Sequence, residues 1–184
     1  MQLVLCSASP RRKELLARAG VRFTVTPSHI DETLRPGESA LGYVRRMAVE
    51  KAAPQRRPGQ VALAADTIVV VDGDVLGKPR DRSDAQRMLA ALSGREHRVI
   101  TAVCVNDAVR EVETAVWFAR LTSRQLAFIV DSGDGDDKAG AYAVQGVAGA
   151  FITAIDGSFS NVIGLPMAET LDMLAQAGVE LPWT

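Results

Sequence analysis

The chain has 184 residues, of which 47% are hydrophobic and 23% are charged, and these values are ordinary for a globular protein. Its 21 basic and 22 acidic residues leave a formal net charge of -1, so no global charge favours binding to nucleic acid or to an anionic membrane. We therefore expect a single domain over residues 1–184, in which any anion site is local.

Cysteine and histidine are too few and too scattered for a zinc site or a disulfide framework. Cys6 and Cys104 form no C-x-x-C pair, and His29 and His97 lack metal-ligand spacing. No stretch approaches the roughly 20 consecutive apolar residues that span a bilayer. We expect a cytoplasmic protein that has neither a membrane nor a nucleic acid as its partner.

Apolar periodicity, caps and turn residues predict the elements of the first half of the chain. A strand over 3–6 precedes a helix that Ser9 caps, that has Pro10 at its first position and that ends at Gly20. A second helix is expected over 39–53. A β-rich run over 61–71 then folds back through an Asp72-Gly73 turn onto residues 75–76.

The second half is predicted to be richer in hairpins. Ser83 is expected to cap a helix that closes at Gly94, and two long paired strands follow over 97–105 and 109–121. Thr122 and Gln125 form a capping-box pattern for a short helix. After a glycine-rich segment, a hairpin is expected over 150–163 and a last helix from Pro166 to 178. This order predicts an α/β fold, with a mixed sheet flanked by helices.

Two arginines lie in the first turn of the helix expected after Ser9, where a helix N-terminus repels each cation by about 0.3–1 kcal/mol. Backbone N–H groups, the hydroxyls of Ser7 and Ser9, and the guanidinium groups of Arg11 and Arg12 would together form a cradle for a polyphosphate. The alternative is that both arginines turn outward into solvent.

Asp66 interrupts the otherwise apolar strand over 61–71. Burial of an ionised carboxylate is costly unless a cation or hydrogen bonds compensate, so Asp66 needs a partner. A functional carboxylate here would be a metal ligand or a general base for water. The alternative is a carboxylate at a strand end that caps a neighbouring loop.

Lys51 and Lys78 are cations beside element ends, although a lysine in such a place is most often solvated. Glu32 is likewise most often a loop carboxylate. With Asp66, however, it would supply the two hard oxygen donors that Mg²⁺ or Mn²⁺ prefers when it bridges phosphates. Spacing alone does not show whether the two carboxylates meet.

The glycine-rich segment over 132–150 contains Lys138, Tyr142 and Gln145. Close backbone approach, ring stacking and hydrogen bonding to a base edge are all available there. The alternative is a tight loop with Tyr142 in the core. The P-loop and the G-x-G-x-x-G fingerprint are both absent, so a nucleotide site in this chain must be of another design.

Eight segments, taken in order over residues 3–175, resemble the Maf family of nucleoside triphosphate pyrophosphatases. They are Ser7-Ala8-Ser9-Pro10-Arg11-Arg12, Ile30-Asp31-Glu32, Glu50-Lys51-Ala52, Ala65-Asp66-Thr67, Gly77-Lys78-Pro79, Ser93-Gly94 with His97, Lys138-Ala139-Gly140-Ala141-Tyr142 with Gln145-Gly146, and Gly164-Leu165-Pro166. The order and compatible spacing of the eight segments make this resemblance specific.

The resemblance implies a fold similar to that of inosine triphosphate pyrophosphatases, with a cleft between two lobes, and hydrolysis of a nucleoside triphosphate at its α-phosphate. It implies that Asp66 accepts a proton and that Glu32 helps to hold a divalent cation. Arg12, Lys51 and Lys78 match positions that line the phosphate site. The remaining matches, associated with substrate binding or substrate choice, are Ser7, Ser9, Arg11, Thr67, Lys138 and Gln145.

The Ala-Asp-Thr, Lys-Ala-Gly-Ala-Tyr and Gln-Gly segments resemble the dTTP/UTP branch of the family, so the expected substrate is one of these pyrimidine nucleotides. One alternative is a nucleotide-binding regulator of septum formation and division arrest. Another is a pyrophosphatase for a different nucleotide, including a modified one. Exposed hairpin edges also favour a symmetric homodimer.

Overall fold

The computed structural model describes residues 1–184, which form two compact units, each built from separate stretches of sequence. Unit 1 comprises Met1–Asp66, Thr101–Val112 and Gly164–Thr184, and unit 2 comprises Thr67–Ile100 and Glu113–Ile163. Three long strands contribute residues to both units. The expectation of a single domain over the whole chain stays a prediction.

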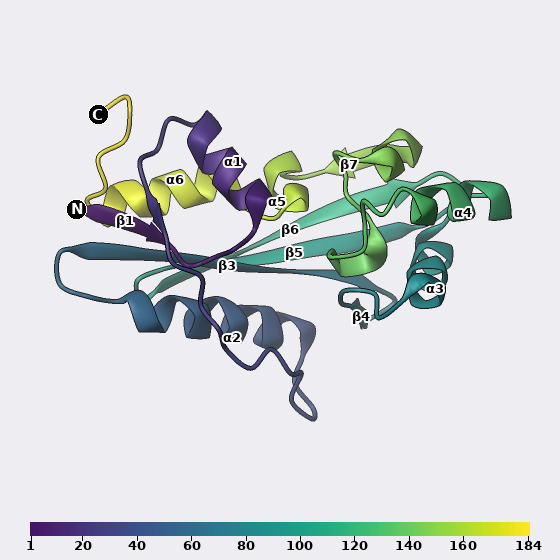
Figure 1. Cartoon of the computed structure of the whole chain (residues 1–184), viewed down its shortest axis with the longest axis horizontal. Helices are drawn as coiled ribbons and strands as arrows, with labels where there is room; N and C mark the ends of the chain where they lie inside the picture. Colours follow the sequence, from purple (N-terminus) through teal and green to yellow (C-terminus); the bar gives the residue numbers. More distant parts are fainter. The chain divides into compact units, whose positions relative to one another are not determined.

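Unit 1 contains the first strands and the terminal helices (Figure 1). Its elements are β1 (Gln2–Leu5), α1 (Pro10–Arg18), β2 (Thr24–Val25), α2 (Ala40–Ala52), the 3-10 helix η1 (Ala53–Gln55), the first part of β3 (Gln60–Val71), parts of β5 (Glu96–Val105) and β6 (Ala108–Phe118), and α6 (Met167–Gln176). β1 lies parallel to both neighbours, with Leu3 opposite Val61 of β3 and Val4 opposite Thr24 of β2.

Helices cover both faces of the sheet in unit 1, with α1 and α6 on one side and α2 on the other (Figure 1). Leu3, Leu5 and Leu63 therefore pack with Leu16 of α1 and Leu174 of α6 in one core. The alternate strand residues, which include Val4, Ala62 and Ala64, are also buried. A strand covered on both faces reads as a continuous apolar run, and β3 does so up to Asp66.

Unit 2 has its own core, to which β3, β5 and β6 contribute their remaining residues. Its further elements are β4 (Asp74–Leu76), α3 (Arg82–Leu92), α4 (Ser123–Asp131), the 3-10 helices η2 (Ala139–Ala141) and η3 (Val147–Phe151), β7 (Ile152–Asp156) and α5 (Phe159–Ile163). α3 packs against α4 and against η2. Met88 and Leu89 of α3 and Ile129 of α4 belong to this core.

The strands form one mixed sheet in the order β2-β1-β3-β5-β6-β7, and β4 pairs with β3. The pairs β3–β4 and β6–β7 are antiparallel, whereas those of β1 are parallel. The expected α/β fold with a mixed sheet flanked by helices is therefore confirmed. The Asp72-Gly73 turn is confirmed as well, since both residues take the positive φ that a tight hairpin needs.

Two predicted elements are wrong in detail. Asp81, not Ser83, caps α3, because the Asp81 side chain accepts a hydrogen bond from the backbone N–H of Asp84. The hairpin expected over 150–163 does not form, since β7 pairs with β6 and residues 159–163 are the helix α5. That helix buries the amide of Asn161, which donates to the Val99 carbonyl and to Thr114 Oγ1.

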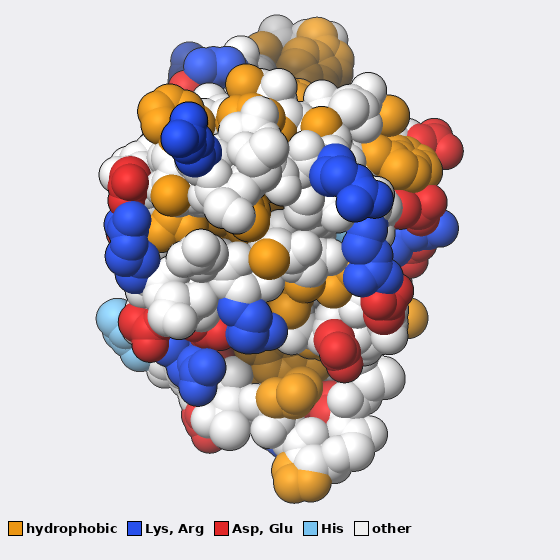
Figure 2. Space-filling view, turned by 90° about the vertical axis from the view of Figure 1, so that its right-hand side faces the viewer, with side chains coloured by type: hydrophobic (Ala, Val, Ile, Leu, Met, Phe, Trp, Pro, Cys, Tyr) orange, Lys and Arg blue, Asp and Glu red, His pale blue; other side chains and the backbone are white.

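One face of the molecule carries both signs of charge close together. On the face that Figure 2 shows, lysine and arginine side chains lie among aspartate and glutamate side chains, with hydrophobic groups scattered between them. An anion on this face would therefore have to be bound by a local arrangement of groups. No helix of the structure is long and apolar enough to cross a membrane.

Candidate active site

A lysine in unit 1 lies between two carboxylates. The ammonium nitrogen of Lys51 is 2.7 Å from Asp66 Oδ1 and 3.0 Å from Glu32 Oε1. The side chains of Lys51 and Asp66 are only 11% and 12% exposed, whereas that of Glu32 is 48% exposed. The three groups thus form an ionic cluster with a buried end at Asp66 and an open end at Glu32.

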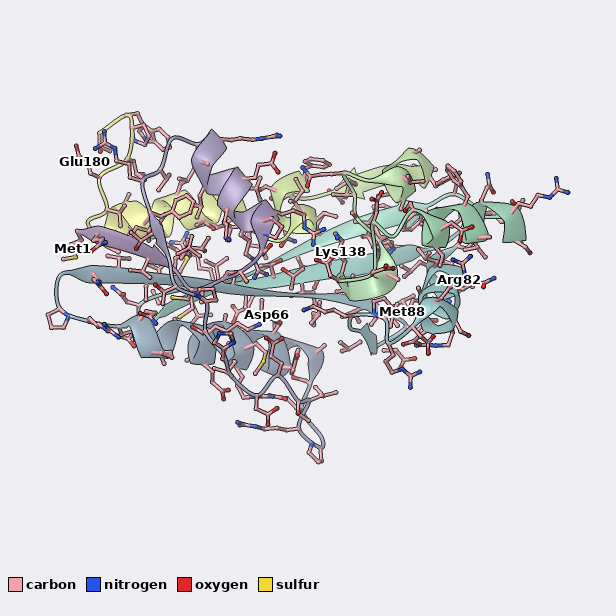
Figure 3. The ribbon with its side chains drawn as sticks, viewed as in Figure 1. Met1, Asp66, Arg82, Met88, Lys138 and Glu180 are labelled. Atoms are coloured by element: carbon pink, nitrogen blue, oxygen red, sulfur yellow. The ribbon has the colours of Figure 1, made fainter.

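The elements of unit 1 explain why these charges meet. Asp66 lies on β3 (Figure 3), in a strand whose preceding five residues are buried. Lys51 lies in the last turn of α2, where the helix dipole favours a cation. The Ser28 hydroxyl donates to the Lys51 carbonyl at 2.5 Å. The buried carboxylate therefore has the cationic partner that its burial requires.

The loop that carries Glu32 is fastened to α2 by two side chains. The Tyr43 hydroxyl donates to the Glu32 carbonyl at 3.0 Å, and Arg46 Nη2 donates to the Thr33 carbonyl at 3.0 Å. Arg46 also holds Glu38 at both carboxylate oxygens, at 2.6 and 2.7 Å. Residues 31–37 are all exposed, so these bonds rather than apolar packing position Glu32.

Two groups near Glu32 have shifted pKa values. Hydrogen bonds from Arg46 lower the pKa of Glu38 to about 2. Burial raises the pKa of Tyr43 to about 12, and the negative charges of Asp66 and Glu32 act in the same direction. Tyr43 therefore stays a neutral hydroxyl that donates to the Glu32 carbonyl throughout the physiological pH range.

In the predicted phosphate cradle, the Arg12 side chain is held by hydrogen bonds within unit 1. Arg12 Nε donates to the Gly164 carbonyl at 2.8 Å, and its Nη1 donates to Ser7 Oγ at 3.2 Å. The Ser9 side chain caps α1. Burial lowers the pKa of Arg12, and the charge of Asp66 opposes that effect. Arg12 therefore does not turn outward, and Arg11 is half-buried.

The other four predicted site residues belong to unit 2. Lys78 is exposed and follows Gly77, whose carbonyl accepts a hydrogen bond from the Gly140 N–H at 3.1 Å. Lys138 pairs with Asp137, Gln145 is exposed, and Thr67 is half-buried on β3. The Gly77–Gly140 hydrogen bond thus links the turn that carries Lys78 to the segment that begins at Lys138.

The chemistry of Glu32 and Asp66 fits a divalent cation, but only one that brings further ligands. No group of three or more His, Cys, Asp or Glu side chains in the structure could hold a metal ion. Mg²⁺ is often bound by one or two carboxylates together with water and substrate phosphates. Lys51 contacts Glu32 Oε1 and Asp66 Oδ1, so a cation bound by these carboxylates would share them with this lysine.

Comparison with known proteins identifies the family of this chain. The sequence model described as "Maf-like protein" matches residues 2–177, which is nearly the whole chain. The chain belongs to the Maf family. The resemblance inferred from eight short segments is therefore confirmed over residues 2–177.

Relatives named in the comparison are similar along nearly their whole length. A protein of Anaeromyxobacter sp. (strain Fw109-5) is 53% identical over 99% of this chain and 92% of its own. One from Myxococcus xanthus (strain DK1622) is 50% identical over 98% and 95%, and one from Symbiobacterium thermophilum is 47% identical over 96% and 94%. Each of these three relatives is named dTTP/UTP pyrophosphatase.

The Maf resemblance pointed to Glu32, Lys51 and Asp66 as site residues, and the structure brings these three together. It did not point to Tyr43 and Arg46, which hold the Glu32 loop on α2. Their signal was spacing, because Tyr43, Arg46 and Glu50 recur at helical intervals of three and four residues and so share one face of α2. That pattern did not indicate that Tyr43 and Arg46 donate to backbone carbonyls of the Glu32 loop.

Proposed function

We propose that this chain is a nucleoside triphosphate pyrophosphatase that hydrolyses dTTP and UTP to the nucleoside monophosphate and pyrophosphate. Membership of the Maf family supports the reaction class, and the names of the relatives support the two substrates. The observation that carries the proposal is the cluster of Lys51 with Glu32 and Asp66, a buried base beside a cation and a second, more exposed carboxylate.

Asp66 is the proposed proton acceptor. A water molecule attacks the α-phosphorus, its proton passes to an Asp66 oxygen, and the bond to the bridging α,β-oxygen breaks so that pyrophosphate leaves with the electron pair. Lys51 is positioned for this step, because its ammonium nitrogen lies 2.7 Å from Asp66 Oδ1 and holds the carboxylate in one orientation.

Charge on the phosphates is the second requirement of the reaction. Arg12 lies in the first turn of α1, and the N-terminus of a helix favours an anion. We propose Ser7, Ser9, Arg11 and Arg12 as substrate-binding residues of unit 1, and Thr67, Lys138 and Gln145 as those of unit 2. Lys51 and Lys78 are the proposed cations that stabilise charge developing on the leaving group.

Glu32 and Asp66 are the proposed ligands of a divalent cation, Mg²⁺ or Mn²⁺. Such an ion supplies Lewis-acid stabilisation of phosphate oxygens when it is bound. Hydrogen bonds from Tyr43 and Arg46 to the loop at Glu32 would then serve to hold one metal ligand in place.

We propose further that the protein acts in the cytoplasm on a free nucleotide, with neither nucleic acid nor membrane as a partner, and that it forms a homodimer. The two cysteines support a reducing compartment, since both are free and buried. The mass of the protein in solution, measured by light scattering after gel filtration, tests the dimer, and a monomer would refute it.

The test of the function is release of pyrophosphate by the purified protein with Mg²⁺ or Mn²⁺. The panel of substrates comprises dTTP, UTP, CTP, dCTP, GTP, 7-methyl-GTP and ATP. Selective release from dTTP and UTP is expected. Release chiefly from 7-methyl-GTP would overturn the assignment of dTTP and UTP as substrates but keep the reaction class. No release from any nucleotide would refute the proposed pyrophosphatase activity.

A further inference from the structure

A buried histidine in unit 2 takes no part in the proposed chemistry. His97 lies on β5 and is 2% exposed. Its ring stacks on Phe118, with centroids 5.6 Å apart and planes at 21°, and meets the edge of Tyr142 at 5.4 Å. His97 Nε2 lies 2.7 Å from the Tyr142 hydroxyl, in a pair of which both partners are buried.

The other ring nitrogen makes this arrangement costly. His97 Nδ1 is buried and has no hydrogen-bond partner. Burial also lowers the pKa of His97 to about 4, so the ring stays neutral at physiological pH. An apolar ring in the same place would stack on Phe118 without leaving a polar atom unsatisfied, so packing alone does not account for a histidine here.

Tyr142 belongs to the segment between Lys138 and Gln145, and the backbone of that segment is strained. Gly140 and Ala141 both take left-handed conformations, with φ of 71° and 59°, and Ala141 is not a residue that adopts this region readily. A Cβ on Gly140 would lie 3.1 Å from the Val69 side chain, so the segment also packs closely onto β3.

Three contacts oppose relaxation of this strain. The Gly140 N–H donates to the Gly77 carbonyl, and the Ala141 N–H donates to the Lys138 carbonyl, both at 3.1 Å. The third contact is the hydrogen bond between Tyr142 and His97, the one that ties the segment to a central strand through a side chain. It acts directly beside the strained residue Ala141.

We infer that His97 is a positioning residue, which fixes Tyr142 through Nε2 and thereby holds residues 138–145 in the conformation that presents Lys138 and Gln145 to the nucleotide. The inference rests on the proposed function, because the conformation of Lys138 and Gln145 affects catalysis only if this segment binds the substrate. His97 itself touches neither the substrate nor the reacting atoms in this role.

Two substitutions at His97 distinguish the roles of its two ring nitrogens, Nδ1 and Nε2. The amide of Gln extends from the backbone about as far as His Nε2, whereas the amide of Asn extends only as far as Nδ1. His97→Gln should therefore keep the hydrogen bond to the Tyr142 hydroxyl, and His97→Asn should lose it. Tyr142→Phe removes the same bond from the opposite side while it preserves the aromatic ring.

The first readout is the steady-state kinetics of pyrophosphate release from dTTP with Mg²⁺. His97→Asn and Tyr142→Phe should raise KM about two- to tenfold, the equivalent of one net hydrogen bond, with kcat nearly unchanged. His97→Gln should restore KM to within about twofold of the wild-type value. Equal KM values for His97→Asn and the wild type would overturn the inference, as would a failure of His97→Gln to restore KM.

The second readout is amide hydrogen exchange of residues 138–146 in the protein without nucleotide, with α6 of unit 1 as the internal reference. Exchange should accelerate in this segment for His97→Asn and Tyr142→Phe, and not for His97→Gln. If the wild type releases no pyrophosphate, the proposed function fails and the exchange data alone decide whether His97 holds the segment. Unchanged exchange in folded His97→Asn would refute positioning in either case.

Discussion

Asp66 and Lys51 are each costly to bury alone and are both buried together. A lone carboxylate or ammonium would lose its hydration in the interior, and the Lys51 nitrogen replaces that water with two carboxylate contacts at 2.7 and 3.0 Å. Because one of these contacts is to the more exposed Glu32, the cluster stays connected to solvent. This arrangement suits a group that must exchange a proton with water.

Replacement of Asp66 tests its role as the proton acceptor. Asp66→Asn preserves the shape of the side chain but removes its charge and its basicity, so the rate of pyrophosphate release should fall about 100-fold or more. The measurement is kcat with dTTP. Asp107→Asn is the matched control, because its carboxylate is 86% exposed and pairs with Arg56. Full activity of a well-folded Asp66→Asn variant would exclude the assignment.

The lowered pKa of His97 predicts how the free energy of unfolding depends on pH. Burial lowers its pKa from 6.5 to about 4, so the unfolded chain binds a proton that the folded chain does not bind between these values. The free energy of unfolding should therefore fall on acidification, by about 2 kcal/mol between pH 7.5 and pH 5. Urea titrations at several pH values measure it.

The control for this pH dependence is a second histidine. His97→Gln should flatten the slope between pH 7.5 and pH 5, whereas substitution of the exposed His29 by Gln should leave it unchanged. The pKa of Glu38 is lowered to about 2, so its contribution to the free energy of unfolding is lost mainly below pH 5 and does not interfere between pH 7.5 and pH 5. An equal slope in the wild type and in His97→Gln would contradict the prediction.

At the scale of elements, most local signals between neighbours in sequence were reliable, although Asp81 rather than Ser83 caps α3. Ser9 and Thr122 cap α1 and α4 as predicted, and Ser39 caps α2, because each side chain accepts a hydrogen bond from the backbone N–H three residues ahead. The pattern over 150–163 was misleading, because the pairing partner of residues 152–156 is β6 and not the segment that follows.

The capping box of α4 supports a stability prediction. Thr122 accepts a hydrogen bond from the Gln125 N–H, and the Gln125 side chain accepts one from the Thr122 N–H at 2.8 Å. Thr122→Ala should lower the free energy of unfolding by about 1 kcal/mol, measured by urea denaturation. Ser123→Ala is the neighbouring control and should change it little. Equal losses for the two variants would show that the cap contributes nothing specific.

At the scale of the whole molecule, each unit has a core of its own. The predicted site residues are distributed over both units, with Glu32, Lys51, Asp66 and Arg12 in unit 1 and Lys78, Lys138 and Gln145 in unit 2. Segments remote in sequence supply each unit, since residues 164–184 complete the core that begins with β1.

Removal of divalent metal tests the proposed cofactor. The proposed site uses two carboxylates, Glu32 and Asp66, so affinity for the ion should depend strongly on each of them. Chelation should abolish pyrophosphate release, and added Mg²⁺ should restore it. Glu32→Gln should raise the Mg²⁺ concentration needed for half-maximal release, by about tenfold or more. Unchanged pyrophosphate release in excess chelator would refute the proposed requirement for a divalent metal.

The sequence by itself determined most helices and strands, because apolar periodicity, caps and turns act between residues close in the chain. It also determined that Asp66 needs a partner, because burial of a lone charge is costly. Only the tertiary structure decided that this partner is Lys51, that Tyr43 and Arg46 hold the Glu32 loop, and that His97 bonds to Tyr142. Such contacts join residues 11 to 45 positions apart, and their geometry depends on how strands and helices pack rather than on any local pattern.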